Sequence, residues 1–173
     1  SKMVITKTDY FYNPLKLIID THKLKEYFND RDQLNMMYDP TRSVGTEPHY
    51  QCLGRHPNDI LDWNFTEICP IFKNSHFEKV ILQVKEKTKR VRIMRMKPKT
   101  CLSFHKDLYK RLHWALITKP ECHISFRENA NSNFVGYHIP ADGYGYMLDT
   151  TIGHTALNPS NYDRYHLVID IIE

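Results

Sequence analysis

The chain has 173 residues, of which 41% are hydrophobic and 25% are charged. This length supports one domain with a hydrophobic core and is short for two domains, and the composition is ordinary for a globular protein. No run approaches the ~20 apolar residues that a membrane helix needs, and no signal-peptide pattern opens the chain. A formal charge of +4 is too small to favour nucleic acid as a partner. We expect a single domain, residues 1–173, with neither a membrane nor a nucleic-acid partner.

The four cysteines are widely spread, at Cys52, Cys69, Cys101 and Cys122, and no Cys-x-x-Cys pair occurs. This pattern argues against a zinc knuckle and against a dense disulfide framework. Reduced cysteines are typical of cytoplasmic proteins, so we expect a cytoplasmic location.

The first part of the chain, residues 1–89, has a mixed helical and loop character. Asp20-Thr21 predicts the start of a short helix that runs to Phe28. Residues 39–58 are rich in proline, glycine, histidine and polar residues, which predicts a long loop.

A second helix has the clearest signal in this part. Ser75 and Glu78 have the spacing of a capping box, and apolar residues follow at helical intervals. These apolar residues are Phe77, Val80, Ile81 and Val84.

After Lys89 the pattern changes to short strands separated by turn residues. The predicted strands are Arg90–Met96, Thr100–His105, Arg111–Thr118, His123–Arg127, Phe134–His138, Tyr144–Leu148, His154–Leu157 and Arg164–Ile172. Strands of this length and spacing are typical of a double-stranded β-helix, or jelly roll. We therefore expect a mainly β (α+β) fold, in which residues 90–173 form the jelly roll and the N-terminal helices pack on one of its sheets.

Two histidines and one aspartate form the strongest candidate site. In an extended strand the side chains of His105 and Asp107 point the same way, and His154 lies on a later predicted strand. Two imidazoles and one carboxylate are the ligands of non-haem iron(II) centres that leave coordination positions open. The sequence therefore predicts a metal site at His105, Asp107 and His154.

The spacing alone is weak, because a chain with ten histidines produces such pairs by chance. His76 and Glu78 have the same spacing, but they fall in a predicted helix, where i and i+2 diverge by roughly 200°. The strand context is what distinguishes His105 and Asp107. Arg164, on the last predicted strand, adds a planar fork suited to a carboxylate. Together they indicate an iron site beside a carboxylate-bearing cosubstrate.

The same residues resemble a known family. The carriers of the resemblance are R-x-x-R-M-K-P at 92–98, His105-x-Asp107, Arg111-Leu112-His113, Asp149, His154 and Arg164. Over residues 90–172 the chain resembles the aspartyl/asparaginyl β-hydroxylases, a family of iron(II)- and 2-oxoglutarate-dependent dioxygenases that includes free-proline cis-hydroxylases. The segment Arg111-Leu112-His113 points to this family in particular.

The resemblance implies that His105, Asp107 and His154 bind iron(II) and that Arg164 binds the distal carboxylate of 2-oxoglutarate. Three further cofactor-binding candidates are Arg111, His113 and His166. For Arg111 and His113, a salt bridge lining the barrel or a hydrogen-bonded core histidine is an open alternative. Asp149 is expected either to support His154 through a hydrogen bond or to cap a turn.

The chain also departs from the family pattern. The best-known membrane-bound peptidyl hydroxylases have glycine where this chain has Asp107, which here matches the free-amino-acid hydroxylases. Met94 aligns with a serine that helps to bind the cosubstrate in some members, and the link from His105 to Arg111 is shorter. These differences concern the substrate more than the cofactor.

Substrate contacts have only weak signals. Arg42 and Arg55 lie in the predicted loop, and Tyr137 and Tyr144 lie on predicted strands where they could line a pocket or pack in the core. The basic stretch 85–99 contains little aromatic character of the kind that stacks on bases, so a solvated surface is expected there.

The resemblance implies a dioxygenase that uses O2 and 2-oxoglutarate to hydroxylate an amino acid or a peptidyl Asp/Asn-like residue, with release of succinate and CO2. The alternatives are a cupin-like metalloprotein that does not use 2-oxoglutarate and a non-catalytic binding module on the same fold. Either small molecules or peptides fit as substrates, and the oligomeric state has no signal in the sequence.

Overall fold

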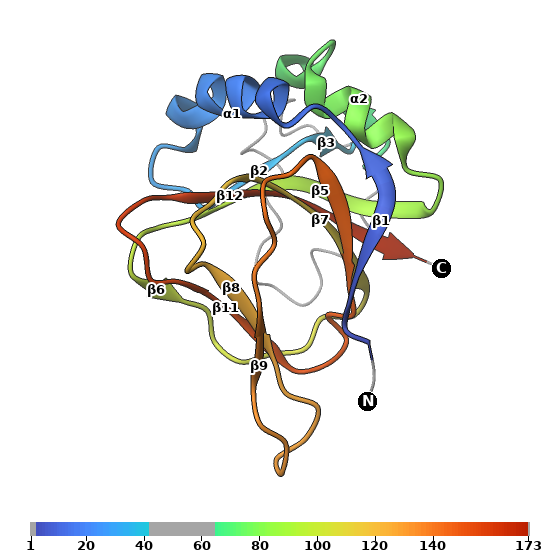
Figure 1. The fold of residues 1–173 in the computed structure, drawn as a ribbon. Helices are drawn as coiled ribbons and strands as arrows, with labels where there is room; N and C mark the ends of the chain where they lie inside the picture. Colours follow the sequence, from blue (N-terminus) through green and yellow to red (C-terminus); the bar gives the residue numbers. More distant parts are fainter. Residues whose placement is uncertain (1–2, 42–64, 173) are drawn as a thin grey trace.

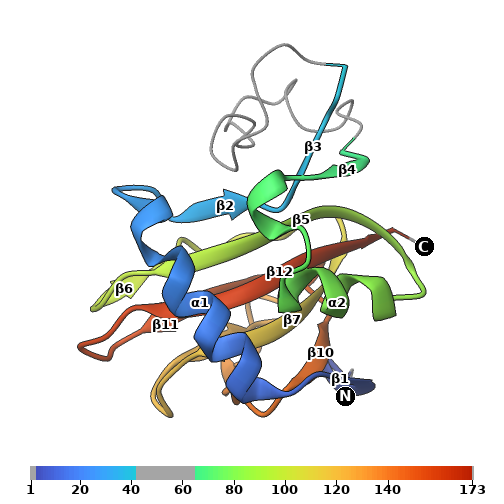
Figure 2. The ribbon, with the colours of Figure 1, turned by 90° about the horizontal axis from the view of Figure 1, so that it is seen from above.

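The computed structural model describes residues 3–41 and 65–172. Two antiparallel sheets face each other, and two helices cover the larger one (Figures 1 and 2). The major sheet contains, in spatial order, β1 (Ile5–Phe11), β10 (Tyr144–Leu148), β7 (Lys110–Ile117), β12 (Arg164–Ile172), β5 (Lys87–Met96) and β2 (Gln33–Asn35). The minor sheet contains β6 (Thr100–Cys101), β11 (His154–Asn158), β8 (His123–Phe126) and β9 (Val135–Tyr137). A short pair, β3 (Met37–Tyr38) and β4 (Glu67–Ile68), lies apart. The predicted jelly roll with helices on one sheet is confirmed.

The first helix, α1 (Pro14–Phe28), begins earlier than the sequence pattern predicted. The side chain of Asn13 accepts a hydrogen bond from the backbone N–H of Leu15 at 2.9 Å, and Pro14 occupies the first helical position. Proline is favoured there because its missing N–H would have no partner within the helix. The prediction of a start at Asp20-Thr21 was therefore wrong, whereas the end at Phe28 was correct.

The second helix, α2 (His76–Gln83), has the predicted cap. Ser75 Oγ accepts a hydrogen bond from the backbone N–H of Glu78 at 3.3 Å, and a short 3-10 helix, Pro70–Phe72, leads into this turn. Phe77 and Val80 are buried. Both helices lie on the outer face of the major sheet (Figure 2).

The major sheet separates two hydrophobic clusters, because successive side chains of a strand point to opposite faces. On the helix side, residues of α1 and α2 pack against strands β5, β7 and β12. The strand residues of this cluster are Val91, Ile93, Leu112, Trp114, Leu116, Tyr165, Leu167, Ile169 and Ile171. A second cluster, which includes Met96, Ala115, Ile124 and Ala156, lies between the two sheets. The polar residues that alternate with the first set, such as Arg164 and His166, therefore face the space between the sheets.

The basic stretch is less exposed than the sequence suggested. Arg92, on β5, is 1% exposed and forms an ion pair with Asp170 at 3.2 Å. Because alternate residues of β5 face the interior of the roll, a basic strand can hold its arginines inside when an acidic partner lies there. The expectation of a solvated surface was wrong for Arg92.

Candidate metal centre

His105 and His154 are held opposite each other by backbone hydrogen bonds. The N–H of each residue donates to the carbonyl of the other, at 3.0 and 2.9 Å, in an isolated antiparallel bridge. Nδ1 of His105 lies 2.6 Å from the carbonyl oxygen of Ser103, and Nδ1 of His154 lies 2.8 Å from that of Ile152. Since a carbonyl only accepts, each Nδ1 carries the proton, and each Nε2 is left with a lone pair for a ligand.

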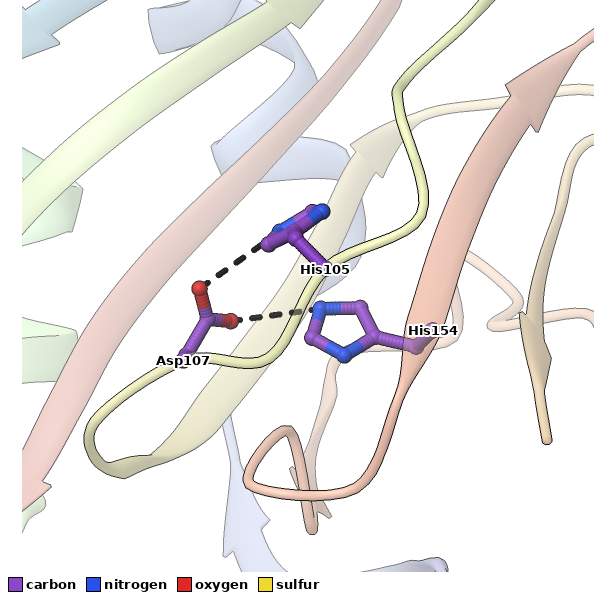
Figure 3. A group of neighbouring side chains, drawn as sticks. All are labelled: His105, Asp107 and His154. Carbon is purple, nitrogen blue, oxygen red and sulfur yellow. Dashed lines mark ion pairs between the residues drawn. The ribbon is translucent and has the colours of Figure 1, made fainter. Parts of the chain in front are cut away.

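Asp107 completes the group from the loop between β6 and β7. Its backbone N–H donates to the carbonyl of Thr150 at 2.8 Å, which continues the contact between the two segments. Its carboxylate oxygens lie 3.5 Å from Nε2 of His105 and 3.2 Å from Nε2 of His154 (Figure 3). The ligand atoms of the three residues lie within 4.8 Å of one another.

The electrostatics of this group fit a cation. Burial disfavours the charged form of Asp107, but its close contacts with His105 and His154 and the charge of Arg111 outweigh burial and hold the pKa of the carboxyl far below its usual range. The same contact with Asp107 raises the pKa of His105. Two imidazole lone pairs facing an ionised carboxylate repel unless a proton or a metal ion lies between them. The three residues therefore fit a divalent metal bound by two histidines and one carboxylate.

A pocket of about 410 Å³, including its solvent-open part, adjoins the metal ligands. The described residues that line it are Met94, Leu102, His105, Arg111, His113, Ile124, Thr150, His154, Ala156 and Arg164. The pocket thus joins the proposed metal ligands to the proposed carboxylate-binding arginine.

Arg164 is a buried cation without a described acidic partner. It is 6% exposed, and its Nε has no hydrogen-bond partner in the described part of the chain. Burial lowers the pKa of its guanidinium to about 10. Arg164 also lines a second hollow, together with residues that include Thr118, Tyr137 and His166. A buried charge without a partner is energetically unfavourable, so Arg164 is suited to bind an anionic ligand from solution.

His113 and His166 form a buried pair beside Arg164. Their Nδ1 atoms lie 3.0 Å apart, on the neighbouring strands β7 and β12. Burial, together with the charge of Arg164, lowers the pKa of both imidazoles well below the usual value. His113 lines the pocket of the metal ligands, and His166 lines the second hollow together with Arg164.

Arg111 has a different set of partners from the one the resemblance implied. Its Nη1 lies 3.0 Å from Asp107 Oδ2, and its Nε donates to Asp170 Oδ1 at 3.1 Å. This arrangement matches the alternative of a salt bridge lining the barrel. Asp170 was missed by the sequence analysis, because a lone aspartate in an apolar strand gives no signal until its cross-strand neighbour is known.

The candidate substrate residues and Asp149 differ in their positions relative to the pocket. Tyr137 lines the hollow next to Arg164, whereas the ring of Tyr144 packs against Phe11, with centroids 4.9 Å apart, and below the Lys7 ammonium. Tyr144 is not among the described residues of either hollow. Asp149 accepts a hydrogen bond from the hydroxyl of Thr151 within its own turn. The two loop arginines, Arg42 and Arg55, lie outside the described residues.

Comparison with known proteins decides the family. The model of the family described as aspartyl/asparaginyl β-hydroxylase matches residues 63–173. The chain belongs to the aspartyl/asparaginyl β-hydroxylase family. The match begins well before residue 90, where the resemblance in the sequence became legible, so it includes α2 as well as the strands. A search among curated proteins found no match.

Solved structures with a TM-score above 0.5 support the fold. The viral collagen prolyl hydroxylase of Paramecium bursaria Chlorella virus-1, as a truncated protein, is 12% identical with a TM-score of 0.56, covering 98% of this chain and 91% of that one. The same enzyme in its 2OG complex is 10% identical with a TM-score of 0.53, covering 98% and 96%. A 2OG-Fe(II) oxygenase family protein of Burkholderia pseudomallei is 14% identical with a TM-score of 0.43, covering 55% and 47%. Among the described residues, no helix is long and apolar enough to cross a membrane.

Proposed function

We propose that this member of the family is an iron(II)- and 2-oxoglutarate-dependent hydroxylase of an amino acid or a peptidyl Asp/Asn-like residue. The observation that carries the proposal is the buried Arg164, without a described acidic partner, in the same pocket as His105 and His154. A metal site alone would not need that cation. A metal that binds a dicarboxylate cosubstrate would.

His105 and His154 would bind the metal through Nε2, since hydrogen bonds to backbone carbonyls fix the proton of each ring on Nδ1. Asp107 would supply a carboxylate oxygen, in the ionised form that its neighbours favour. Three protein ligands leave coordination positions open for the cosubstrate and O2. When bound, iron(II) with 2-oxoglutarate supplies the oxidative chemistry, in which a substrate C–H, O2 and 2-oxoglutarate give C–OH, succinate and CO2.

Arg164 would bind the distal carboxylate of 2-oxoglutarate through its guanidinium, which orients the cosubstrate. His113 and His166, kept neutral by burial, would present nitrogen atoms that donate or accept without adding charge. Leu102, Ile124 and Ala156 give the pocket an apolar wall, which limits water around the reacting atoms.

For the substrate we propose only a chemical class, an amino acid or a peptidyl Asp/Asn-like residue. Tyr137 stays a substrate candidate because it lies beside Arg164, and Arg42 and Arg55 stay predictions. Cys69, Cys101 and Cys122 are free thiols. Free thiols are compatible with a cytoplasmic location, which stays a prediction.

The experiment is to incubate the purified protein with a cell lysate, iron(II), ascorbate and 2-oxoglutarate, and to search by mass spectrometry for products heavier by one oxygen atom. The control is the His154→Ala variant in the same lysate. We expect oxygen-containing products that depend on 2-oxoglutarate and are lost in the variant. Products that form equally with the variant would contradict the proposal.

A further inference from the structure

A single buried carboxylate forms ion pairs with three arginines next to the proposed metal ligand Asp107. Asp170, on β12, is 2% exposed. The ion-pair distances from its carboxylate oxygens are 3.7 Å to Arg90 Nη1, 3.2 Å to Arg92 Nη1 and 3.1 Å to Arg111 Nε. Arg92 and Arg111 belong to motifs that carry the family resemblance, but that resemblance assigned no role to Asp170, and the proposed reaction has not used the cluster.

The register of the sheet produces the cluster. Strands β7 and β12 pair Arg111 directly with Asp170, so the two side chains lie on the same face. On the other side of β12, a bulge in the pairing with β5 falls where Arg90 has a positive φ of 53°. An extra residue in a bulged strand redirects the side chains around it, which lets Arg90 and Arg92 both approach Asp170.

Arg111 differs from Arg90 and Arg92 because it also contacts a proposed metal ligand. Its Nη1 lies 3.0 Å from Asp107 Oδ2, while its Nε donates to Asp170. A guanidinium is planar and rigid, so fixing Nε also fixes the direction of Nη1. Asp170 therefore determines where Arg111 can hold the carboxylate of Asp107.

We infer that Asp170 and Arg111 are positioning residues, which orient Asp107 for the metal. The inference rests on the proposed function, since it assigns the two residues a role toward the same metal. It gives Arg111 to the metal ligand and leaves the distal carboxylate of 2-oxoglutarate to Arg164. Arg111 pairs with Oδ2 of Asp107, whereas Oδ1 lies 3.5 Å from Nε2 of His105, so Arg111 restricts the rotation of the carboxylate and leaves Oδ1 for the metal.

Manganese(II) binding, measured by calorimetry without any turnover, tests this role. Arg111→Gln removes the charged fork, and we expect about 10-fold or more weaker manganese binding, which is the usual effect of losing a residue that orients a metal ligand. Arg111→Lys keeps the positive charge but lacks the planar guanidinium. Its manganese affinity should lie between those of Arg111→Gln and the wild type. Arg90→Gln is the matched control, because Arg90 contacts Asp170 but has no ion pair with Asp107. Its manganese affinity should equal that of the wild type.

Asp170→Asn tests whether Asp170 affects the metal through Arg111 or independently of Arg111. If Asp170 acts through Arg111, this variant weakens manganese binding, and adding it to Arg111→Gln causes no further loss. Additive losses would overturn the linkage. Thermal unfolding is measured in parallel, and if Asp170→Asn does not fold, the ranking of Arg111→Gln, Arg111→Lys and Arg90→Gln decides.

The outcomes distinguish this inference from the proposed function. Wild-type protein that binds no manganese would overturn both. Wild-type protein that binds manganese, together with an Arg111→Gln variant that binds it equally well, would overturn the positioning role alone. A lower melting temperature for Arg111→Gln with unchanged manganese affinity would assign the cluster to folding and would also overturn it.

Discussion

His105 and His154 face each other as a bridged pair, and each accepts the other's backbone N–H, at 2.9 and 3.0 Å. The bridge joins the segment after β6 to the first residue of β11, which brings two histidines far apart in sequence to one point. Each imidazole is then oriented by a carbonyl two residues before it in the chain. This backbone bridge thus places two of the three proposed metal ligands.

Removal of His154 tests the metal site directly. Two remaining ligands rarely hold a divalent ion, so His154→Ala should lose manganese(II) and iron(II) binding in calorimetry, whereas the wild type should bind near one ion per chain. His22→Ala, an exposed position on α1, is the control and should bind normally. Normal metal binding by His154→Ala would remove this residue from the site.

Arg164 should affect the cosubstrate and not the metal. Loss of one partner of a buried arginine–carboxylate pair costs about 2–5 kcal/mol, so Arg164→Ala should weaken 2-oxoglutarate binding by roughly 30-fold or more. Arg164→Lys should retain part of the affinity, because it keeps the charge and loses the fork. Manganese affinity should not change. Equal losses of metal and 2-oxoglutarate binding would instead indicate a structural role.

The His113–His166 pair predicts how stability depends on pH. In the unfolded chain both imidazoles take up protons below about pH 6.5, whereas in the folded protein their pKa values lie well below that. Unfolding therefore takes up protons in acid. The contribution of the two histidines to the free energy of unfolding is full above about pH 6.5 and is lost as the pH falls below it.

The variant His166→Gln removes one of these groups. From urea unfolding at pH 7.5 and pH 5.5, the loss of stability between the two pH values should be smaller in the variant by about 1.4 kcal/mol, the effect of one proton over this range. Burial and the charges of neighbouring arginines lower the pKa of His113, and the variant keeps both, so His113 and the other histidines contribute nearly equally to the two proteins. An identical loss in the two proteins would show that His166 titrates normally in the folded state.

Asn158 should be a strong determinant of stability. It is fully buried, and its Nδ2 donates to the carbonyls of Met96, Lys97 and Tyr162 at 2.8–3.1 Å. Its Oδ1 accepts from the backbone N–H and the hydroxyl of Ser160. Asn158→Ala leaves several buried groups without partners, so we expect a loss of about 2–4 kcal/mol in urea unfolding. Asn158→Asp keeps the acceptor but loses both N–H donors of the amide, and a variant as stable as the wild type would contradict this account.

The sequence predicted the jelly roll because strands of period two, separated by turn residues, leave a local signal. The candidate ligands were named from an expected strand through His105, but β6 ends at Cys101, and a backbone bridge to His154 and the loop before β7 bring the three side chains together. The strand β1 was not predicted, because it is an edge strand whose exposed and partly exposed residues give little alternation. The start of α1 differs from the prediction because Asn13 and Pro14 form a stronger helix start than Asp20-Thr21.

The partners of Arg111 show what a sequence cannot supply. Arg111 and Asp170 meet only because β7 and β12 pair in one particular register, which is set by packing across the whole sheet. The same holds for Arg92, which is buried although it belongs to a basic stretch. Sequence patterns indicate which way a side chain points, but they do not identify the residue opposite to it.

Metal-dependent binding of 2-oxoglutarate tests the central claim most directly. Calorimetric titration of 2-oxoglutarate would be compared for the metal-free protein and for the manganese(II)-loaded protein, in the absence of O2. If the pocket joins a metal at His105, Asp107 and His154 to Arg164, then 2-oxoglutarate should bind the loaded protein and bind the metal-free protein at least tenfold more weakly. Equal binding with and without metal, or no binding to the loaded protein, would contradict the assignment.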